Sequence, residues 1–202
     1  MKKISFNLII KILISLFITI IWLMFFWGLS ILFASEENKN NRKFNSYQLE
    51  IGKDQAIISK YIKVIRPTMP KILRNGMAYE IAKQSKQNGL PWQLITAIIK
   101  VESYFDPMAV SIVGAKGLMQ VYSLVCRGII IDESKLFNIQ YNIFCGICIF
   151  QEKLEVARGN YERAIVLYCG KGPEARQYGK KVLKTISEII AFDVAYNNLK
   201  II

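Results

Sequence analysis

Histidine is absent from this 202-residue chain. A serine or cysteine hydrolase with histidine as general base is therefore excluded, and so is a zinc site of mixed cysteine and histidine ligands. Any acid–base reaction must then rely on a carboxyl group. The four cysteines are Cys126, Cys145, Cys148 and Cys169. A metal site would need all four to converge, although two of them share one expected helix, so we expect neither a metal nor a cofactor.

Charge is absent from residues 12–34, a stretch of 23 residues that three lysines precede. This length crosses the hydrocarbon layer of a bilayer as one tilted helix. We expect an uncleaved transmembrane anchor, preceded by a short cytoplasmic tail of residues 1–11. The alternative is a cleaved signal peptide, but the apolar region is long for one and large residues stand where cleavage prefers a small residue.

The remaining length has room for one modest domain. Residues 35–70 are expected to form a polar tether, because Glu36 to Gln48 is polar and rich in asparagine, with a possible helix over Gln55 to Ile65. We expect the domain itself over residues 71–186 and a C-terminal tail over residues 187–202.

Apolar residues at helical spacing predict helices throughout the domain. Gly89 ends one helix and Pro91 opens the next, Asn160 caps a later helix, and Pro173 starts the last one. The predicted fold class is mainly α, and a very short β element around Leu118 to Tyr122 is left open.

Glu102 continues an apolar helical stripe formed by Ile95, Ile98 and Ile99. A carboxyl on such a stripe is partly stripped of water, which raises its pKa and suits it to general acid catalysis. The alternative is a buried glutamate neutralised by a nearby cation. The residues that follow favour catalysis, because an Asp-Pro pair at 106–107 ends the helix and a loop with two glycines comes next.

Four blocks of residues follow one another over about residues 72–186. They are Glu102-Ser103 with Phe105-Asp106-Pro107, Ala109-Val110-Ser111 with Gly114-Ala115-Lys116-Gly117-Leu118-Met119-Gln120, Asn142-Ile143 with Gly146, and Ala164 to Tyr168 with Gly170 to Pro173. In this order they resemble the soluble lytic transglycosylase domain, a lysozyme-like family related to goose-type lysozymes. The resemblance implies a lysozyme-like helical domain.

The resemblance also implies cleavage of peptidoglycan by a single carboxyl. Glu102 would protonate the glycosidic oxygen between N-acetylmuramic acid and N-acetylglucosamine, and would then take the proton of the C6 hydroxyl, leaving a 1,6-anhydromuramoyl end. Further residues match positions that bind substrate or support the cleft in the family. They are Ser111, Met119, Gln120, Asn142 and Tyr168. Each has a structural alternative, such as a turn, a core position or a helix cap.

Two other functions remain open. A goose-type hydrolase would use water and would need a second acid, for which Asp106 is the nearby candidate, although its Asp-Pro turn favours a structural role. A non-catalytic peptidoglycan-binding scaffold would keep the fold without the reaction. The family commonly has asparagine where this chain has Cys169, which bears on the details of the site.

The resemblance further implies a disulfide between Cys169 and either Cys145 or Cys148, because the family packs the two helices concerned near the cleft. Free buried thiols are the default alternative. In an oxidising compartment one disulfide is reasonable.

The net charge is +12, and it stays strongly positive without the three N-terminal lysines. A basic domain would be held near anionic peptidoglycan and lipids, although a solvated basic face explains the charge equally well. No motif for nucleic acid binding is found. Because the charges flanking residues 12–34 are balanced, the expected topology rests on the resemblance and on the short N-terminal tail, which is the natural cytoplasmic end. The resemblance implies a single-pass protein of the cell membrane with a periplasmic domain, and an envelope or secretion complex as a further partner.

Overall fold

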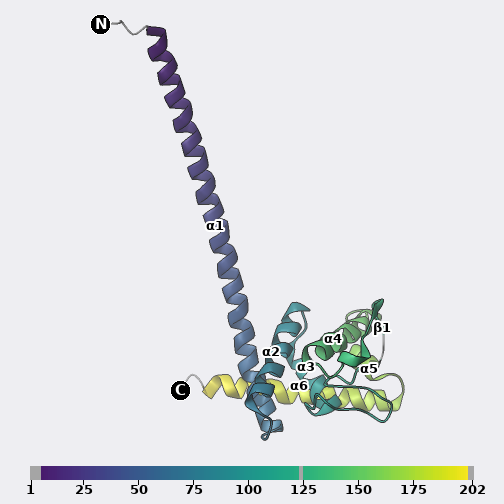
Figure 1. Cartoon of the computed structure of the whole chain (residues 1–202). Coiled ribbons are helices and arrows are strands. Elements are labelled where there is room, and N and C mark those ends of the chain that lie inside the picture. Colours follow the sequence, from purple (N-terminus) through teal and green to yellow (C-terminus); the bar gives the residue numbers. More distant parts are fainter. Residues whose placement is uncertain (1–5, 123–124, 200–202) are drawn as a thin grey trace. The chain divides into compact units, whose positions relative to one another are not determined.

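The computed structural model describes residues 6–122 and 125–199. Within them the chain forms six α-helices, a short 3-10 helix at Glu133–Lys135 and two strands, so the predicted mainly helical fold is confirmed (Figure 1). The helices are α1 Phe6–Ile65, α2 Lys71–Gln87, α3 Trp92–Ser103, α4 Ile139–Val156, α5 Tyr161–Cys169 and α6 Pro173–Leu199.

The chain divides into two compact units, Met1–Leu49 and Glu50–Ile202, and α1 contributes to both. In the first unit α1 exposes large apolar side chains, including Trp22, Phe25, Phe26 and Trp27. None of the helices that the structure describes is both long and apolar enough to cross a membrane. The transmembrane span predicted for residues 12–34 is therefore not confirmed. The predicted tail of residues 1–11 lies partly outside the described residues.

The second unit starts earlier than residue 71, where the sequence analysis places the start of the domain. Helix α1 runs without a break to Ile65, and Ile51, Ile58 and Ile62 on it are buried. Buried isoleucines stabilise a helix by packing, whereas a polar tether has none to bury. The possible helix over Gln55 to Ile65 is therefore confirmed, and it belongs to the second unit, which starts at Glu50.

Most other helix boundaries follow the signals in the sequence. Gly89 follows α2 with φ 64°, a conformation that glycine adopts without strain. Pro91 is the N-cap of α3 rather than its first residue. The Asn160 side chain caps α5 by accepting a hydrogen bond from the Arg163 N–H, and α6 begins at Pro173 as predicted.

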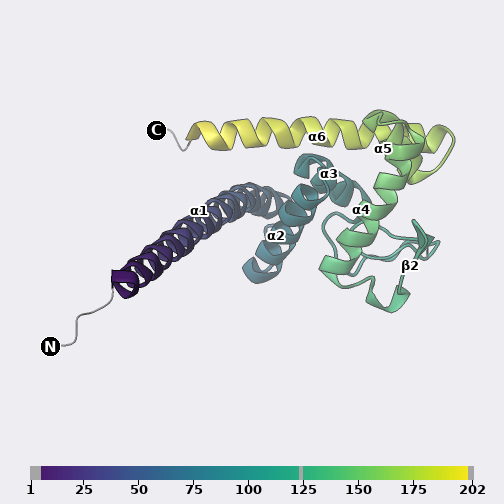
Figure 2. The ribbon, with the colours of Figure 1, turned by 90° about the horizontal axis from the view of Figure 1, so that it is seen from above.

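Helix α6 extends well beyond residue 186, into the segment predicted as a C-terminal tail. This extension packs on the domain: Ile189 is buried, Glu188 forms an ion pair with Lys100 of α3, and the ring of Phe192 contacts Tyr61 of α1. Figure 2 shows α6 lying along α3 and α5. Residues up to Leu199 thus continue a helix of the domain.

The core forms around α3 and α4. Helix α3 packs against α2 and α6, and α4 packs against α2 and α5. Ile95, Ile98 and Ile99 on α3 are fully buried, as their spacing predicts. Helix α3, which carries Glu102 in its last turn, is thereby fixed by contacts on two sides.

The β structure lies slightly later in the chain than residues 118–122. Strands β1 Val125–Cys126 and β2 Ile129–Ile130 form an antiparallel hairpin. Its turn, Arg127-Gly128, has positive φ at both residues, as a tight hairpin turn requires. Within residues 118–122, Val121 forms only an isolated bridge to Lys116.

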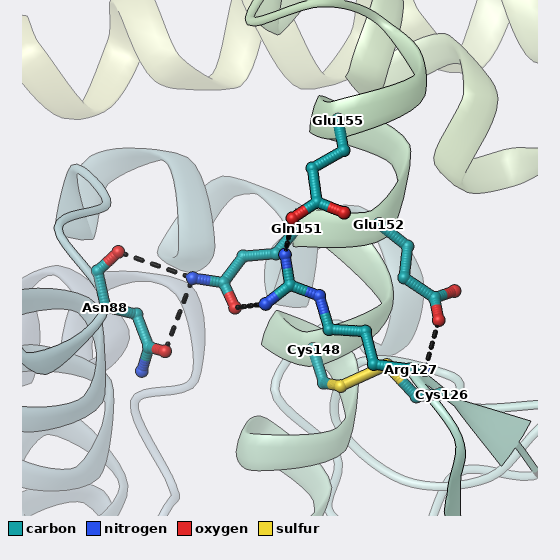
Figure 3. The surroundings of a disulfide bond; sticks show 7 residues. All are labelled: Asn88, Cys126, Arg127, Cys148, Gln151, Glu152 and Glu155. Carbon is teal, nitrogen blue, oxygen red and sulfur yellow. Dashed lines mark hydrogen bonds and ion pairs between the residues drawn. A yellow bond between two sulfur atoms is a disulfide. The ribbon is translucent and has the colours of Figure 1, made fainter.

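A disulfide joins Cys126 of β1 to Cys148 of α4 (Figure 3). Arg127 reinforces this attachment, because its backbone N–H donates to the Glu152 carboxylate and its guanidinium pairs with Glu155. The disulfide that the resemblance implied for Cys169 is wrong.

The reason lies in the placement of the other two cysteines. Cys145 is buried and free, and Cys169 is free and exposed. Helix α4 brings Cys148 to the hairpin, whereas Cys169 is the last residue of α5. Which of two cysteines three residues apart reaches a partner is decided by the tertiary arrangement.

Candidate active site

Glu102 lies in the last turn of α3 and is half-buried. The hydroxyl of Tyr178 on α6 donates a hydrogen bond to Glu102 Oε1 at 2.7 Å. Burial raises the pKa of the Glu102 carboxyl to about 7, and the hydrogen bond from Tyr178, which lowers the pKa, offsets only part of that rise. Near neutral pH both the acid and the carboxylate are therefore well populated, so the same group can donate and accept a proton.

The backbone that follows Glu102 is strained. Tyr104 and Phe105 have φ of 52° and 62°, in a region that large side chains rarely adopt. Phe105 is fully buried, and Arg66 Nη1 donates to the Tyr104 carbonyl at 3.1 Å. These contacts hold the turn in place. Helix α3 therefore ends at Ser103, one residue after Glu102 and three residues before the predicted end at Asp106.

Asp106 has a structural role in this turn. Its Oδ1 accepts a hydrogen bond from the Met108 N–H at 2.9 Å, and it is not among the residues that line the cleft at Glu102. The placement agrees with the loop-stabilising role predicted for Asp106.

Ser111 lies in a tight loop that lines the cleft together with Glu102. Its N–H donates to the Ala115 carbonyl, and its Oγ accepts from the Ala115 N–H at 3.0 Å. Gly114, with φ 87°, closes the turn. Ser111 thus shapes the turn and at the same time lines the cleft.

Asn142 and Met119 support the cleft from behind. The buried Asn142 amide donates to the carbonyls of Lys116 and Leu136, at 2.9 and 2.8 Å, and accepts from the Met119 N–H at 2.8 Å. These three hydrogen bonds all join the Asn142 side chain to backbone groups. Met119 is fully buried. Neither residue lines the cleft, so their placement indicates positioning of the loop rather than contact with substrate.

Two glycines make this packing possible. A Cβ on Gly117 would lie 2.3 Å from Asn142 Nδ2 and 2.5 Å from the Leu136 carbonyl oxygen. A Cβ on Gly146 would lie 2.4 Å from Met119 Sδ. All three distances are far below van der Waals contact, so the loop can approach α4 only where side chains are missing.

Gln120 and Tyr168 line the cleft on either side of Met119. Gln120 has φ 46°, and its Nε2 donates to the Gly117 and Ala109 carbonyls. The Tyr168 hydroxyl donates to the Met119 carbonyl at 2.9 Å. Burial raises the pKa of Tyr168 well above its usual value, and the nearby Glu102 adds to the rise. Tyr168 therefore remains a neutral donor.

The cleft has a volume of about 450 Å³. It is lined by residues from α3, the 111–122 loop, α4 and the end of α5. They are Glu102, Ser111, Val113, Ala115, Gln120, Tyr122, Ile149, Lys153, Leu167, Tyr168, Cys169 and Gly170. Among these described residues Glu102 has the one carboxyl and Lys153 the one ammonium. A larger cavity of about 660 Å³ lies between α2 and the start of α4, but no carboxyl lines it.

Sequence reasoning missed two members of this site. Tyr178 is part of an apolar stripe on α6, and nothing in that stripe shows that its hydroxyl reaches a residue 76 positions earlier. Lys153 follows the apolar face of α4 and is one of many lysines. Cys169 lines the cleft as a free thiol, and burial, with a smaller contribution from Glu102, raises its pKa.

No group of three or more cysteine, aspartate or glutamate side chains in the described parts of the chain is placed to hold a metal ion. The polar groups that line the described cleft are the Glu102 carboxyl, the Lys153 ammonium, and the side chains of Ser111, Gln120, Tyr122, Tyr168 and Cys169.

Comparison with known proteins agrees with this arrangement. The family model for the Transglycosylase SLT domain matches residues 80–190, more than half of the chain. The membrane-bound lytic murein transglycosylase F of Desulfosudis oleivorans is 37% identical over 113 residues, which cover 55% of this chain and 23% of that protein. The transglycosylase of Enterobacteria phage PRD1 is 27% identical over 113 residues, covering 53% of this chain and 42% of that protein.

The chain thus spans less than half the length of either curated relative. Among solved structures, the 70 kDa soluble lytic transglycosylase from Escherichia coli matches with a TM-score of 0.43 at 18% identity, over 72% of this chain and 30% of that one. On the family match, which contains α3, α4, α5 and the whole cleft, the chain belongs to the Transglycosylase SLT domain family.

Proposed function

We propose that this chain is a peptidoglycan lytic transglycosylase in which Glu102 acts first as the acid and then as the base. The observation that carries the proposal is the state of Glu102: a half-buried carboxyl with a pKa of about 7, held by Tyr178 in a cleft whose described lining has no second carboxyl. Membership of the family and the printed names of two relatives, both transglycosylases, support the choice of substrate and reaction.

The reaction starts with protonated Glu102. It donates its proton to the glycosidic oxygen between N-acetylmuramic acid and N-acetylglucosamine, and the bond to C1 breaks as positive charge develops on the muramoyl ring. Glu102 is then a carboxylate and removes the proton from the C6 hydroxyl of the same sugar. The C6 oxygen bonds to C1, which leaves a 1,6-anhydromuramoyl end and returns Glu102 to its protonated form.

A pKa near 7 suits both halves of this cycle, since neither protonation state is far from the operating pH. The usual glycosidase instead has two carboxyl groups flanking the bond. Asp106 is the nearby second acid in the sequence, but it accepts a hydrogen bond in its own turn and does not line the cleft. This observation favours the transglycosylase over a goose-type hydrolase.

Substrate contacts are assigned to the residues that line the cleft. Ser111, Gln120 and Tyr168 each have a polar side chain and line the cleft together with Glu102. Lys153 offers a positive charge to the carboxylates of the muramoyl lactyl group or its peptide. Cys169 replaces the amide that the family commonly has, so this chain lacks a group that could form a hydrogen bond to substrate or to the acid.

The N-terminal region is assigned to membrane attachment. Residues 12–34 have no charge, several aromatic side chains are exposed in this part of α1, and one relative is named as membrane-bound. Because peptidoglycan lies outside the cytoplasmic membrane, the domain would act on the periplasmic side, in wall remodelling or in opening the wall for an envelope-spanning complex.

Fractionation tests the attachment. The full chain should sediment with membranes and resist extraction by high salt, whereas a chain starting at Tyr47 should stay in the supernatant. Release of the full chain by salt alone would contradict attachment through residues 12–34.

Digestion of purified peptidoglycan tests the enzyme itself. The full chain in neutral detergent should release anhydromuramoyl products detectable by mass spectrometry, and Glu102→Gln should lower the rate by about 10²–10⁴-fold. Glu162→Gln, an exposed glutamate on α5, is the matched control and should keep full activity. If Glu102→Gln cleaves as well as Glu162→Gln, a catalytic role for Glu102 is excluded. If the parent chain forms no product, a non-catalytic binding module is favoured.

A further inference from the structure

A second cavity, of about 400 Å³, lies between the C-terminal part of α1 and the first turn of α2. It shares no lining residue with the cleft at Glu102. Four cationic side chains line it, and none of the described residues that line it is acidic. The cations are Lys60, Lys63, Lys71 and Arg74, and we call this cavity the basic pocket.

None of these four side chains forms an ion pair within the described part of the chain. Elsewhere in the same domain, Lys86, Lys100 and Lys116 each pair with a glutamate. Lys60 instead lies over the ring of Tyr196, at 4.2 Å from its centroid. The positive charge of the pocket is thus left without a neighbouring carboxylate.

Arg74 shows the same pattern with a half-buried guanidinium. Its Nε donates to Ser59 Oγ at 3.2 Å, and its Nη1 donates to the Met69 carbonyl at 3.3 Å. Both acceptors are neutral. The Ser59 hydroxyl in turn donates to the Asn75 side chain at 2.7 Å. These bonds fix the guanidinium at the pocket and leave its charge uncompensated.

The start of α2 adds to the positive potential. Its N-cap is Pro70, which offers no side-chain acceptor, and its first turn contains no acidic residue. The N-terminal end of a helix carries partial positive charge and is stabilised by anions, not by cations. Here Lys71 and Arg74 occupy the first turn instead. This arrangement costs stability unless an anion is present.

We propose that the basic pocket binds a phosphate group carried by a small organic ligand or a lipid. A phosphate has several charged acceptor oxygens, and it can therefore accept hydrogen bonds from the ammonium groups, from the fixed guanidinium and from the open N–H groups of α2 at once. The pocket is larger than a phosphate ion, and the amides of Gln55 and Asn75 in its lining suit hydroxyl groups on an attached glycerol or sugar. The site is independent of the proposed reaction, because the two cavities share no residue.

Calorimetric titration of the full chain in neutral detergent tests the site, with inorganic phosphate and glycerol 3-phosphate as probes at constant ionic strength. The pocket variant is Lys60→Gln, Lys63→Gln and Lys71→Gln together; all three side chains are exposed. The matched control is Lys180→Gln, Lys181→Gln and Lys184→Gln, three exposed lysines on α6 that remove the same charge. We expect saturable binding that weakens at least tenfold in the pocket variant and less than twofold in the control.

Thermal unfolding gives a second test, because the parent and the pocket variant are expected to respond differently to phosphate. Without phosphate the pocket variant should unfold at the same or a higher temperature than the parent, because repulsion has been removed. With phosphate the parent should gain stability through binding to the folded state, and the variant should not. Absence of saturable binding to the parent, or equal weakening in the pocket variant and the control, would overturn the proposal.

A competition experiment identifies the source of the phosphate. Micelles containing phosphatidylglycerol are compared with micelles containing phosphatidylcholine for their ability to displace glycerol 3-phosphate. If phosphatidylglycerol displaces glycerol 3-phosphate and phosphatidylcholine does not, the pocket binds anionic lipid headgroups. If glycerol 3-phosphate binds and neither lipid displaces it, the pocket binds soluble phosphate esters or phosphodiester polymers.

Discussion

The catalytic cleft and the basic pocket are cavities of similar size, about 450 and 400 Å³, but they differ in the charged groups that line them. In the cleft, burial disfavours the charged form of the Glu102 carboxyl and raises its pKa. The carboxyl can therefore still carry a proton near neutral pH. The pocket gathers four cations, of which three are on exposed side chains. Burial of a single group thus serves proton transfer, and accumulation of exposed charge serves the binding of anions.

The two sites also differ in how rigidly they are built. The cleft depends on a buried asparagine, two positions that admit no Cβ and a pair of residues at positive φ. Three of the four cations of the pocket are long exposed side chains. We therefore expect substitutions to have large effects in the cleft and small ones on folding in the pocket.

The largest effect on stability should come from Glu102→Gln at alkaline pH. The folded-state pKa of Glu102 is about 7, above the ordinary glutamate value of 4.5. The folded state therefore becomes less stable as the pH rises from 4.5 to 7, and above pH 7 the loss in the free energy of unfolding is constant at about 3 kcal/mol. Glutamine has no such cost. Denaturant unfolding at pH 5 and pH 9 should show that the variant becomes more stable relative to the parent only at pH 9. An equal difference in stability at the two pH values would contradict the burial argument.

Gly117→Ala should destabilise the domain by about 2 kcal/mol, through strain at positive φ and the clash with Asn142 and the Leu136 carbonyl. Gly128→Ala is its control, because Gly128 has the same φ of 75° and no atom near the position of a Cβ. The control should lose only the strain, about 1 kcal/mol. If the two variants unfold at the same denaturant concentration, the close approach of the loop to α4 is not what holds the cleft.

Tyr178→Phe should lower cleavage by about tenfold, or about 1.4 kcal/mol, because the carboxyl loses the hydrogen bond that orients it. That bond also lowers the pKa of Glu102, so in the variant the pKa should rise. The fall of activity on the alkaline side should then move to higher pH. A slower variant with an unmoved pH profile would indicate a structural role only.

The smallest effect should come from the basic pocket. Lys60→Gln, Lys63→Gln and Lys71→Gln together should leave the free energy of unfolding within about 0.5 kcal/mol of the parent in phosphate-free buffer, and cleavage of a soluble glycan fragment within twofold. A loss as large as that of Gly117→Ala would show that the two sites are not built differently.

Much of the fold is readable from the sequence, because its boundaries rest on local signals. Gly89, Pro91, Asn160 and Pro173 mark helix ends through backbone geometry and capping, and these effects act within a few residues. Glu102 is also readable, since a carboxyl on an apolar stripe is a local pattern, and its raised pKa follows from the burial of that stripe.

What the sequence does not disclose depends on contacts between distant segments. The bond between Cys126 and Cys148, the contact of Tyr178 with Glu102 and the packing of Phe192 against Tyr61 are all set by tertiary structure. Asn142 and Met119 show the same limit. The resemblance placed Met119 in the lining of the cleft and Asn142 in a position that supports it. The described lining contains neither residue, and the two are joined by a hydrogen bond from the Met119 N–H to Asn142 Oδ1.

The central claim is that one carboxyl cleaves the glycan without water. Digestion of peptidoglycan by the full chain in water enriched in oxygen-18 tests it directly, with mass spectrometry of the new muramoyl ends. The one-carboxyl mechanism predicts anhydromuramoyl ends that contain no oxygen-18, because the C6 oxygen of the same sugar closes the ring. Reducing ends that carry oxygen-18 from the solvent would contradict it and would identify a hydrolase.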